Sequence, residues 1–218
     1  MKSSPRIAFL AAILVMPIWC GPELAGLGAA AKGPQTDTPA KPAVYVSDFE
    51  IDVVPPEGGQ QKPEDDPRKL AGRLVELMST KLVAALRKGG YTAVRMHRGD
   101  ARPDRGVQIR GLFAEVDEEN HWRRAVIRSA DDSGAIEALV TVANLAKPEQ
   151  ALYEIAPMPG NEDKPGAVIT FSPYIPLTKF DLSKDAKEDV FQKIAPQIVN
   201  DLTDLLNANP LAIPQKFA

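Results

Sequence analysis

Arginine is the side chain that most clearly crowds one part of this sequence. Guanidinium groups bind carboxylates and phosphates through paired hydrogen bonds. A patch made by Arg110, Arg123, Arg124 and Arg128 on the solvent face of a sheet would therefore be a site for an anionic ligand. The simpler interpretation, which we favour, pairs these arginines with acidic residues across a hairpin, as is ordinary in antiparallel sheets. The crowded segment holds Arg95, Arg98, Arg102, Arg105, Arg110, Arg123, Arg124 and Arg128, and the acidic residues are Glu115, Asp117, Glu118 and Glu119.

The other reactive side chains form no familiar catalytic or metal-binding motif. The sequence has two histidines, His97 and His121, and each is expected in a loop or turn, where solvent exposure explains it better than a metal. Residues 131–134 (Asp-Asp-Ser-Gly) lack the alternating acids and distal glutamate of a calcium loop and fit a hairpin turn. No G-x-S-x-G motif or phosphate-binding glycine loop is present. We therefore expect no catalytic residue, no metal and no cofactor.

The first 31 residues have the pattern of an export signal. Lys2 and Arg6 supply positive charge, and residues 7–19 form an apolar run. That run is shorter than the roughly 20 residues that a membrane-spanning helix needs. Small residues follow and end in Ala29-Ala30-Ala31, an A-x-A cleavage pattern. We expect cleavage after Ala31 and a location in the periplasm or outside the cell.

The fate of Cys20, the one cysteine of the sequence, depends on where that signal is cut. Cleavage after Ala31 removes Cys20 and leaves a mature protein without thiols. Lipidation of Cys20 is the alternative, although the bulky Trp19 stands where lipoproteins carry a small residue. A retained N-terminal anchor is the third alternative. A lipid on Cys20 is the membrane link that the sequence allows for a mature protein otherwise expected to be soluble, and it would make the protein a lipoprotein of the cell envelope.

Changes in composition and in hydrophobic pattern divide the rest of the chain into segments. The net charge of −3 argues weakly against nucleic-acid binding. Residues 32–43 are rich in proline and polar side chains and predict a disordered tether. Residues 44–208 alternate between strand and helix patterns and predict a single α/β domain. Residues 209–218 form a C-terminal tail.

The first half of that domain has clear element signals. Residues 44–54 alternate with a period of two and predict a strand. Asp66 as N-cap, Pro67 at the first position and a stripe of leucines predict a helix over residues 67–88. Gly89-Gly90 predicts a left-handed stop, and residues 91–96 predict a second strand.

The second half predicts an antiparallel meander and a closing helix. Its strands are expected over residues 106–116, 121–129 and 135–145, with a bulge near Gly111 where the apolar alternation changes phase. A helix is expected over residues 184–208, capped by Ser183 or Asp185 and kinked at Pro196. The fold class is therefore α/β, with a mixed sheet and two long helices packed on one face.

Four short segments resemble an exported bacterial family known as domain of unknown function 4410. The resemblance covers residues 43–207 and implies export without implying any activity. Where members carry a glycine-rich stretch after the fourth strand, residues 128–134 keep one glycine. The segments are residues 44–49 (Val-Tyr-Val-Ser-Asp-Phe), 82–90, 109–113 (Ile-Arg-Gly-Leu-Phe) and 118–128 with their paired arginines.

These observations lead to one functional expectation and two alternatives. We expect a non-catalytic binding or assembly module of the cell envelope, whose partner is an unidentified envelope protein or a second copy of the chain. The first alternative is a periplasmic hydrolase, which requires a concave pocket with a buried carboxylate near His97 or His121. The second is an anionic-ligand binder that uses the patch of Arg110, Arg123, Arg124 and Arg128.

Overall fold

A computed structural model describes residues 41–54, 66–147, 153–155, 166, 168–173 and 175–208, with the backbone alone for 153–155. The expected export signal with Cys20 and Ala31, most of the tether and the C-terminal tail lie outside the described residues. Among the described helices, none combines the length and apolar character needed to cross a bilayer.

Helix α1 (Pro67–Lys88) forms where its local signals place it. Oδ1 of Asp66 accepts a hydrogen bond from the backbone N–H of Arg68 at 2.9 Å, which satisfies one free donor of the first turn. Gly90, with φ of 82°, takes the left-handed conformation expected after the helix. Most leucines of the α1 stripe are buried, as at Leu74 and Leu82, whereas Leu77 is partly buried.

A mixed sheet carries the domain. Its strands lie in the order β10-β7-β4-β1-β3, and β5 pairs with β4 beyond the end of β1. Strand β1 is parallel to both β3 and β4, whereas β4, β7, β10 and β5 meet in antiparallel pairs. The strand bounds are β1 (Ala43–Ser47), β3 (Thr92–Met96), β4 (Val107–Val116), β5 (Trp122–Arg124), β7 (Ala135–Asn144) and β10 (Leu177–Ser183).

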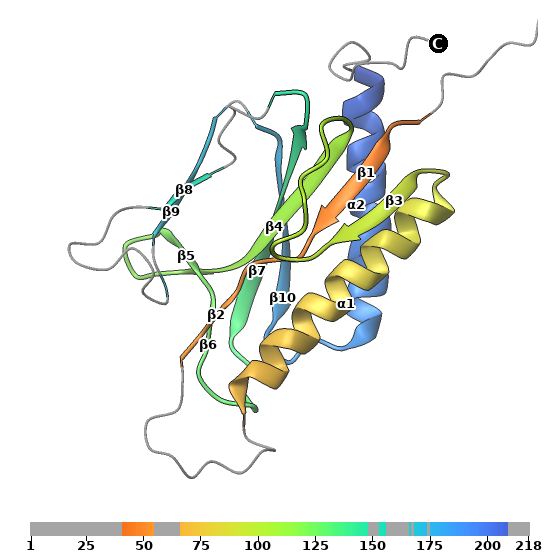
Figure 1. Cartoon of the computed structure of the whole chain (residues 1–218). Coiled ribbons are helices and arrows are strands. Elements are labelled where there is room, and N and C mark those ends of the chain that lie inside the picture. Colours follow the sequence, from red (N-terminus) through yellow and green to blue (C-terminus); the bar gives the residue numbers. More distant parts are fainter. Residues whose placement is uncertain are drawn as a thin grey trace, which may run out of the picture. The chain divides into compact units, whose positions relative to one another are not determined.

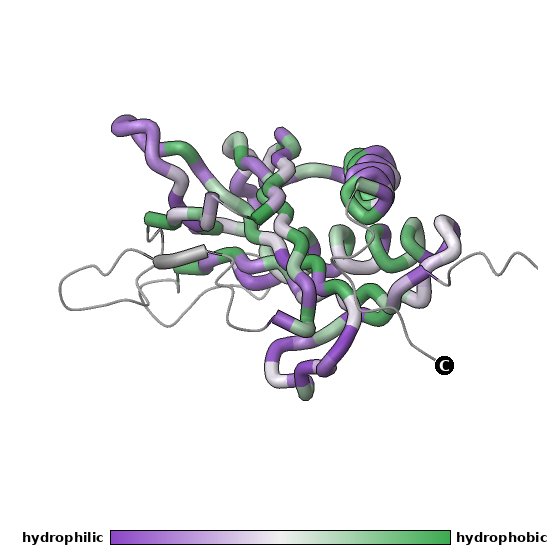
Figure 2. Tube along the Cα trace, turned by 90° about the horizontal axis from the view of Figure 1, so that it is seen from above, coloured by the Kyte–Doolittle hydropathy of each residue, from purple (hydrophilic) through white to green (hydrophobic). Residues whose placement is uncertain are grey.

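Both helices pack on one face of this sheet, as expected (Figure 1). Helix α2 (Glu188–Ala208) lies against α1, and one core joins Val46 of β1, Met78 of α1 and Ile198 of α2. In Figure 2 the helix seen along its axis is hydrophobic on the side that faces the domain and hydrophilic on the outer side. This pattern is typical of a helix that buries one stripe.

The expected start of the second helix is wrong. Helix α2 begins at Glu188, and Ser183 and Asp185, the expected caps, lie before it. Strand β10 continues through Ser183, whose hydroxyl donates to the Asp185 carboxylate in the turn that follows. The helix continues through Pro196.

The expected single strand over residues 44–54 is interrupted. It divides into β1 and β2 (Asp52–Val53), and β2 pairs in parallel with β6 (Val126–Ile127). Val44 and Val46 point into the helical core, and Phe49 reaches the same core three residues after Val46. A period-two strand cannot place both an even and an odd position on one face, so the chain leaves the β1 ladder between them.

The expected bulge at Gly111 is also wrong, because β4 pairs with β7 in one unbroken register from Val107 to Ala114. The apolar alternation changes phase because both faces of β4 are covered. Phe113 faces the helices, whereas Leu112 and Ala114 pack with Ile169 of β9 (Ile169–Phe171) on the other face. Strand β9 pairs with β8 (Tyr153–Ile155).

The three strands of the expected meander are antiparallel, but their order in space differs. Strand β7 pairs with the opposite edge of β4 from β5, so β4 is the central strand. The expected strand over residues 121–129 divides at Ala125 into β5 and β6. Strand β6 pairs with β2 and not with β4. Strand β7 pairs with the edge of β4 that lies opposite β5.

Candidate functional site

A groove of about 800 Å³ opens beyond the carboxyl ends of β1 and β3. Parallel strands end at the same edge of a sheet, and this edge is where ligands commonly bind in α/β folds. We call it the β1–β3 groove. Its walls come from residues 47–52, which run from the end of β1 to the start of β2, from residues 95–98 with Asp100 and Arg102 around the end of β3, and from α1 at Ala71, Gly72 and Val75. Arg110 of β4 and Arg124 of β5 also line it.

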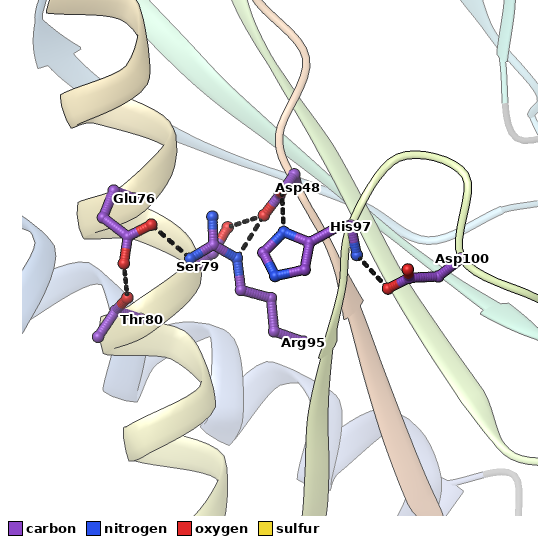
Figure 3. Close-up of polar contacts among 7 residues, drawn as sticks. All are labelled: Asp48, Glu76, Ser79, Thr80, Arg95, His97 and Asp100. Carbon is purple, nitrogen blue, oxygen red and sulfur yellow. Dashed lines mark hydrogen bonds and ion pairs between the residues drawn. The ribbon is translucent and has the colours of Figure 1, made fainter. Parts of the chain in front are cut away.

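Asp48, the first residue after β1, connects several side chains in this groove (Figure 3). Its Oδ1 accepts a hydrogen bond from Nε of Arg95 at 2.6 Å and another from Oγ of Ser79 at 3.1 Å. Its Oδ2 lies 3.0 Å from Nδ1 of His97. Because an ionised carboxylate only accepts, Nδ1 of His97 carries the proton in this contact.

Arg95 extends this contact to helix α1. Its Nη1 pairs with Oε2 of Glu76 at 2.5 Å, and Oγ1 of Thr80 donates to the other Glu76 oxygen at 2.8 Å. The guanidinium thus joins the end of β3 to the chain after β1 and to one face of α1 (Figure 3). We call Asp48, Glu76, Ser79, Thr80, Arg95 and His97 the Asp48 cluster.

The electrostatics of the cluster hold its carboxylates in the charged form. Burial on its own would raise the pKa of Asp48, but hydrogen bonds from Arg95, His97 and Ser79 and the charge of Arg95 outweigh it and lower the pKa. The pKa of Glu76 is lowered mainly by its hydrogen bond from Arg95. Asp48 is therefore ionised at neutral pH and is a poor proton donor.

A second set of ion pairs lines the same groove. Nη2 of Arg110 lies 2.9 Å from Oε1 of Glu50, and Nε of Arg124 donates to Oδ2 of Asp52 at 3.1 Å. Arg124 also lies 3.7 Å from Glu50, and its side chain is only 13% exposed. The backbone N–H of Gly166 donates to Asp52 at 3.0 Å. Arg110 and Arg124 are therefore each already paired with an acid that lines the groove.

The four arginines of the alternative anion patch do not gather on one exposed face. Arg123 and Arg124 are neighbours on β5, so their side chains leave opposite faces of the strand. Nε of Arg123 pairs with Asp117 at 2.6 Å, and Arg128 lies 4.0 Å from Glu115, as cross-hairpin pairing predicts. Arg110 and Arg124 take Glu50 and Asp52, acids that the hairpin interpretation did not include.

The two histidines lie in different surroundings. His97 is 62% exposed and its Nδ1 is held by Asp48 at the groove. His121 lies in the hairpin turn, where its Nδ1 is 3.6 Å from Asp117 and 3.5 Å from Glu119.

Ligand atoms of Asp117, Glu119 and His121 lie close enough together for a cation. Asp117, however, accepts hydrogen bonds from the backbone N–H groups of Glu119 and His121 and an ion pair from Arg123. The Asp117 oxygens are thus used to close the turn, and the positive charge of the adjacent Arg123 guanidinium would repel a metal cation.

Sequence reasoning missed Arg98 and Arg102 as site residues. Both are exposed, both line the groove, and the side chain of neither has a hydrogen-bond or ion-pair partner among the described residues. The signal that could have identified them is their position in the loop that directly follows a parallel strand.

Comparison with known proteins identifies a family without assigning an activity. No curated protein matches the chain. A crystal structure of a Xanthomonas campestris protein with the family model DUF330 is 10% identical, covers 81% of this chain and 91% of its own, and has a TM-score of 0.31. A family model described as "Domain of unknown function (DUF4410)" matches residues 44–175, which include all of β1 except Ala43, α1, β3 and the whole β1–β3 groove. The chain belongs to this family, as its sequence motifs predicted.

Proposed function

We propose that this chain is a non-catalytic binding module of the bacterial cell envelope and that the β1–β3 groove is its binding site. The export pattern of residues 1–31 supports the location. The volume of the groove, about 800 Å³, supports the site, because small-molecule sites commonly measure about 300–1,000 Å³.

One observation carries the non-catalytic part of the proposal, namely how Asp48 is used. Both of its oxygens are occupied by Arg95, Ser79 and His97, and its pKa is lowered. Ser79 donates to this carboxylate, whereas nucleophilic catalysis requires a hydroxyl in contact with the histidine base. Among the described residues, no hydroxyl or thiol hydrogen-bonds to His97.

A bound molecule tests the groove directly. We expect native mass spectrometry of the protein, purified from cell envelopes without denaturation, to detect a small molecule retained by it. Gly72 lines the groove, and a Cβ added there would meet no atom within 4 Å, so Gly72→Trp should place an indole in the groove, obstruct it and remove this molecule. Lys193→Trp, on the exposed side of α2, is the matched control and should keep it. A ligand absent from the unsubstituted protein, or retained by Gly72→Trp, would contradict the proposal.

The mature N-terminus tests the location. Intact-mass measurement should give a chain that begins after Ala31, or a chain that begins at a lipidated Cys20. Both outcomes place the domain outside the cytoplasm. A chain that keeps Met1 and fractionates with cytoplasmic proteins would show that the export signal is not used.

A hydrolase remains the second candidate, because a half-buried carboxylate lies beside His97 in the β1–β3 groove. Asp48, 24% exposed, holds Nδ1 of His97 at the groove, and this leaves Nε2 free to accept a proton. The two candidates differ in turnover of nitrophenyl esters, phosphoesters and glycosides. We expect no turnover above buffer. Turnover that His97→Ala abolishes without loss of folding would favour the hydrolase.

A further inference from the structure

We propose that the ligand of the β1–β3 groove is a small organic anion, whose carboxylate or phosphate group is bound by Arg98 and Arg102. This inference rests on the proposed function, since it names the ligand class of the same groove. It also moves the anion site away from the four arginines that the sequence singled out.

The balance of charge in the groove is the first argument. Three acids line the groove outside the loop that follows β3, and each is paired with an arginine: Asp48 with Arg95, Glu50 with Arg110, and Asp52 with Arg124. Arg95 also pairs with Glu76, which lies outside the lining. The loop that follows β3 adds Arg98, Arg102 and one acid, Asp100. Among the residues that line the groove, arginines therefore outnumber acids by one, and the unpaired guanidiniums lie in this loop.

Asp100 does not neutralise that excess by direct pairing. Its Oδ2 accepts the backbone N–H of His97 at 2.7 Å, and its own N–H donates to the carbonyl of His97 at 3.1 Å. The carboxylate thus closes the turn at the end of β3 (Figure 3). Arg98 and Arg102 keep all their guanidinium donors available to a ligand.

The loop is also held in place before any ligand arrives. Gly99 has a φ of 96°, a conformation that suits glycine, within the turn from His97 to Asp100. The imidazole of His97 anchors the start of the turn on Asp48. A fixed loop loses less conformational entropy on binding than a mobile one, so its two guanidiniums are better placed to bind an oxyanion.

The remaining walls indicate an organic body on the anion. Ala71 and Val75 of α1 and Ile51 present aliphatic surface to the same groove. A bare inorganic ion would leave that surface in water, whereas a short hydrocarbon attached to the charged group would cover it. Pockets of this kind commonly combine apolar walls with a few polar groups that set orientation.

The test is calorimetric titration at low ionic strength with three probes that share one chain: hexanoate, hexyl phosphate and hexylammonium. At least one of the two anions should bind, and which one binds distinguishes a carboxylate ligand from a phosphate ligand. Replacing both Arg98 and Arg102 with alanine should raise Kd about tenfold or more, since charge-assisted bidentate hydrogen bonds are strong. Added salt should weaken the binding.

A matched control removes the same charge from elsewhere. Arg68 and Arg73 lie on exposed positions of α1, outside the groove lining, and their side chains have no partner among the described residues. Their double alanine variant should change Kd less than about twofold. Anion binding that is equal in both double variants, or absent in the unsubstituted protein, overturns the inference.

The outcomes also separate this inference from the proposed function. If hexylammonium binds, the anions do not, and Gly72→Trp abolishes that binding, the groove is a binding site and the ligand class is wrong. If no probe binds and no molecule is retained in native mass spectra, the groove itself is not a binding site.

Discussion

Nε of Arg95 lies 2.6 Å from Oδ1 of Asp48, and this ion pair fastens the carboxyl ends of two parallel strands, β1 and β3, to each other. Both side chains are about three-quarters shielded from solvent. The same guanidinium continues to Glu76 on α1. One side chain thus fixes the three elements that form the β1–β3 groove.

Breaking this pair should destabilise the domain. We expect Arg95→Met and Asp48→Asn each to lower the free energy of unfolding by about 1–3 kcal/mol, because each removes one charge of a largely shielded, hydrogen-bonded ion pair. The measurement is urea unfolding, and a double-mutant cycle isolates the pairwise part. Lys193→Met breaks an exposed ion pair with Asp189 on α2 and should cost less than about 0.5 kcal/mol. Equal effects at both sites would contradict the assigned role.

Acid should weaken the domain through Asp48. Burial opposes the shift, yet hydrogen bonds from Arg95 and His97 lower the pKa of Asp48 below its ordinary value. The unfolded chain therefore binds a proton at this carboxyl before the folded chain does. Its contribution is fully present above about pH 4, the ordinary range for aspartate, and is lost as the pH falls through the folded pKa. Unfolding midpoints measured from pH 6 to pH 2 should fall more steeply for the unsubstituted protein than for Asp48→Asn.

Gly111 is where the ring of Phe49 crosses β4. A Cβ at position 111 would lie 2.2 Å from Cε1 of Phe49, so Gly111→Ala forces the buried ring or the strand to move. We expect a loss of about 1–3 kcal/mol, typical of overpacking in a close-packed core. Adding Phe49→Leu should cost less in the Gly111→Ala background than alone, and thermal unfolding measures both.

The control for Gly111 is a glycine with room around it. Gly72 lies inside α1, and a Cβ there meets no atom within 4 Å. Gly72→Ala should therefore raise stability by about 0.5–1 kcal/mol, since alanine is the better helix former. A similar loss at both positions would show that the Phe49 contact is not the cause.

Elements that depend on local signals were predictable from the sequence. The Asp66 cap, Pro67 and the leucine stripe of α1 all lie within one segment, and the helix has the expected bounds. The break after β1 depends on Phe49 and Gly111, which are far apart in the chain and meet across the sheet. The second apolar face of β4 depends on Ile169 of β9. Such contacts leave no local pattern, so the sequence alone does not distinguish a strand covered on both faces from a strand with a bulge.

The candidate site was less predictable for the same reason. His97 and Asp48 are 49 residues apart and meet because β1 and β3 are parallel and end together. Arg124 and Asp52 are separated by 72 residues. Sequence reasoning identified the arginine-rich segment, but pairing across that distance decides which guanidiniums remain available. The exposed pair, Arg98 and Arg102, emerges only when the acids of the groove are assigned to the others.

Among the lysines of the described residues, Lys184 should be the one whose replacement destabilises the domain most. Its side chain is 4% exposed, and its Nζ pairs with Glu115 of β4 at 2.8 Å and with Asp132 at 3.3 Å. It also donates to the backbone carbonyl of Val126 in β6 at 2.8 Å. One buried ammonium thus ties the turn after β10 to β4, β6 and the turn before β7.

Replacing Lys184 with methionine keeps much of its volume and removes its charge. The carboxylates of Glu115 and Asp132 then lose their common cation, and breaking a buried ion pair in this way costs about 3–5 kcal/mol. Lys187→Met changes an exposed lysine in the same connection to α2 and should stay within about 0.5 kcal/mol. Asp132→Asn added to Lys184→Met should recover part of the loss, because it removes one unpaired charge. If urea unfolding gives the same midpoint for Lys184→Met and Lys187→Met, the ammonium is solvated and does not hold these elements together.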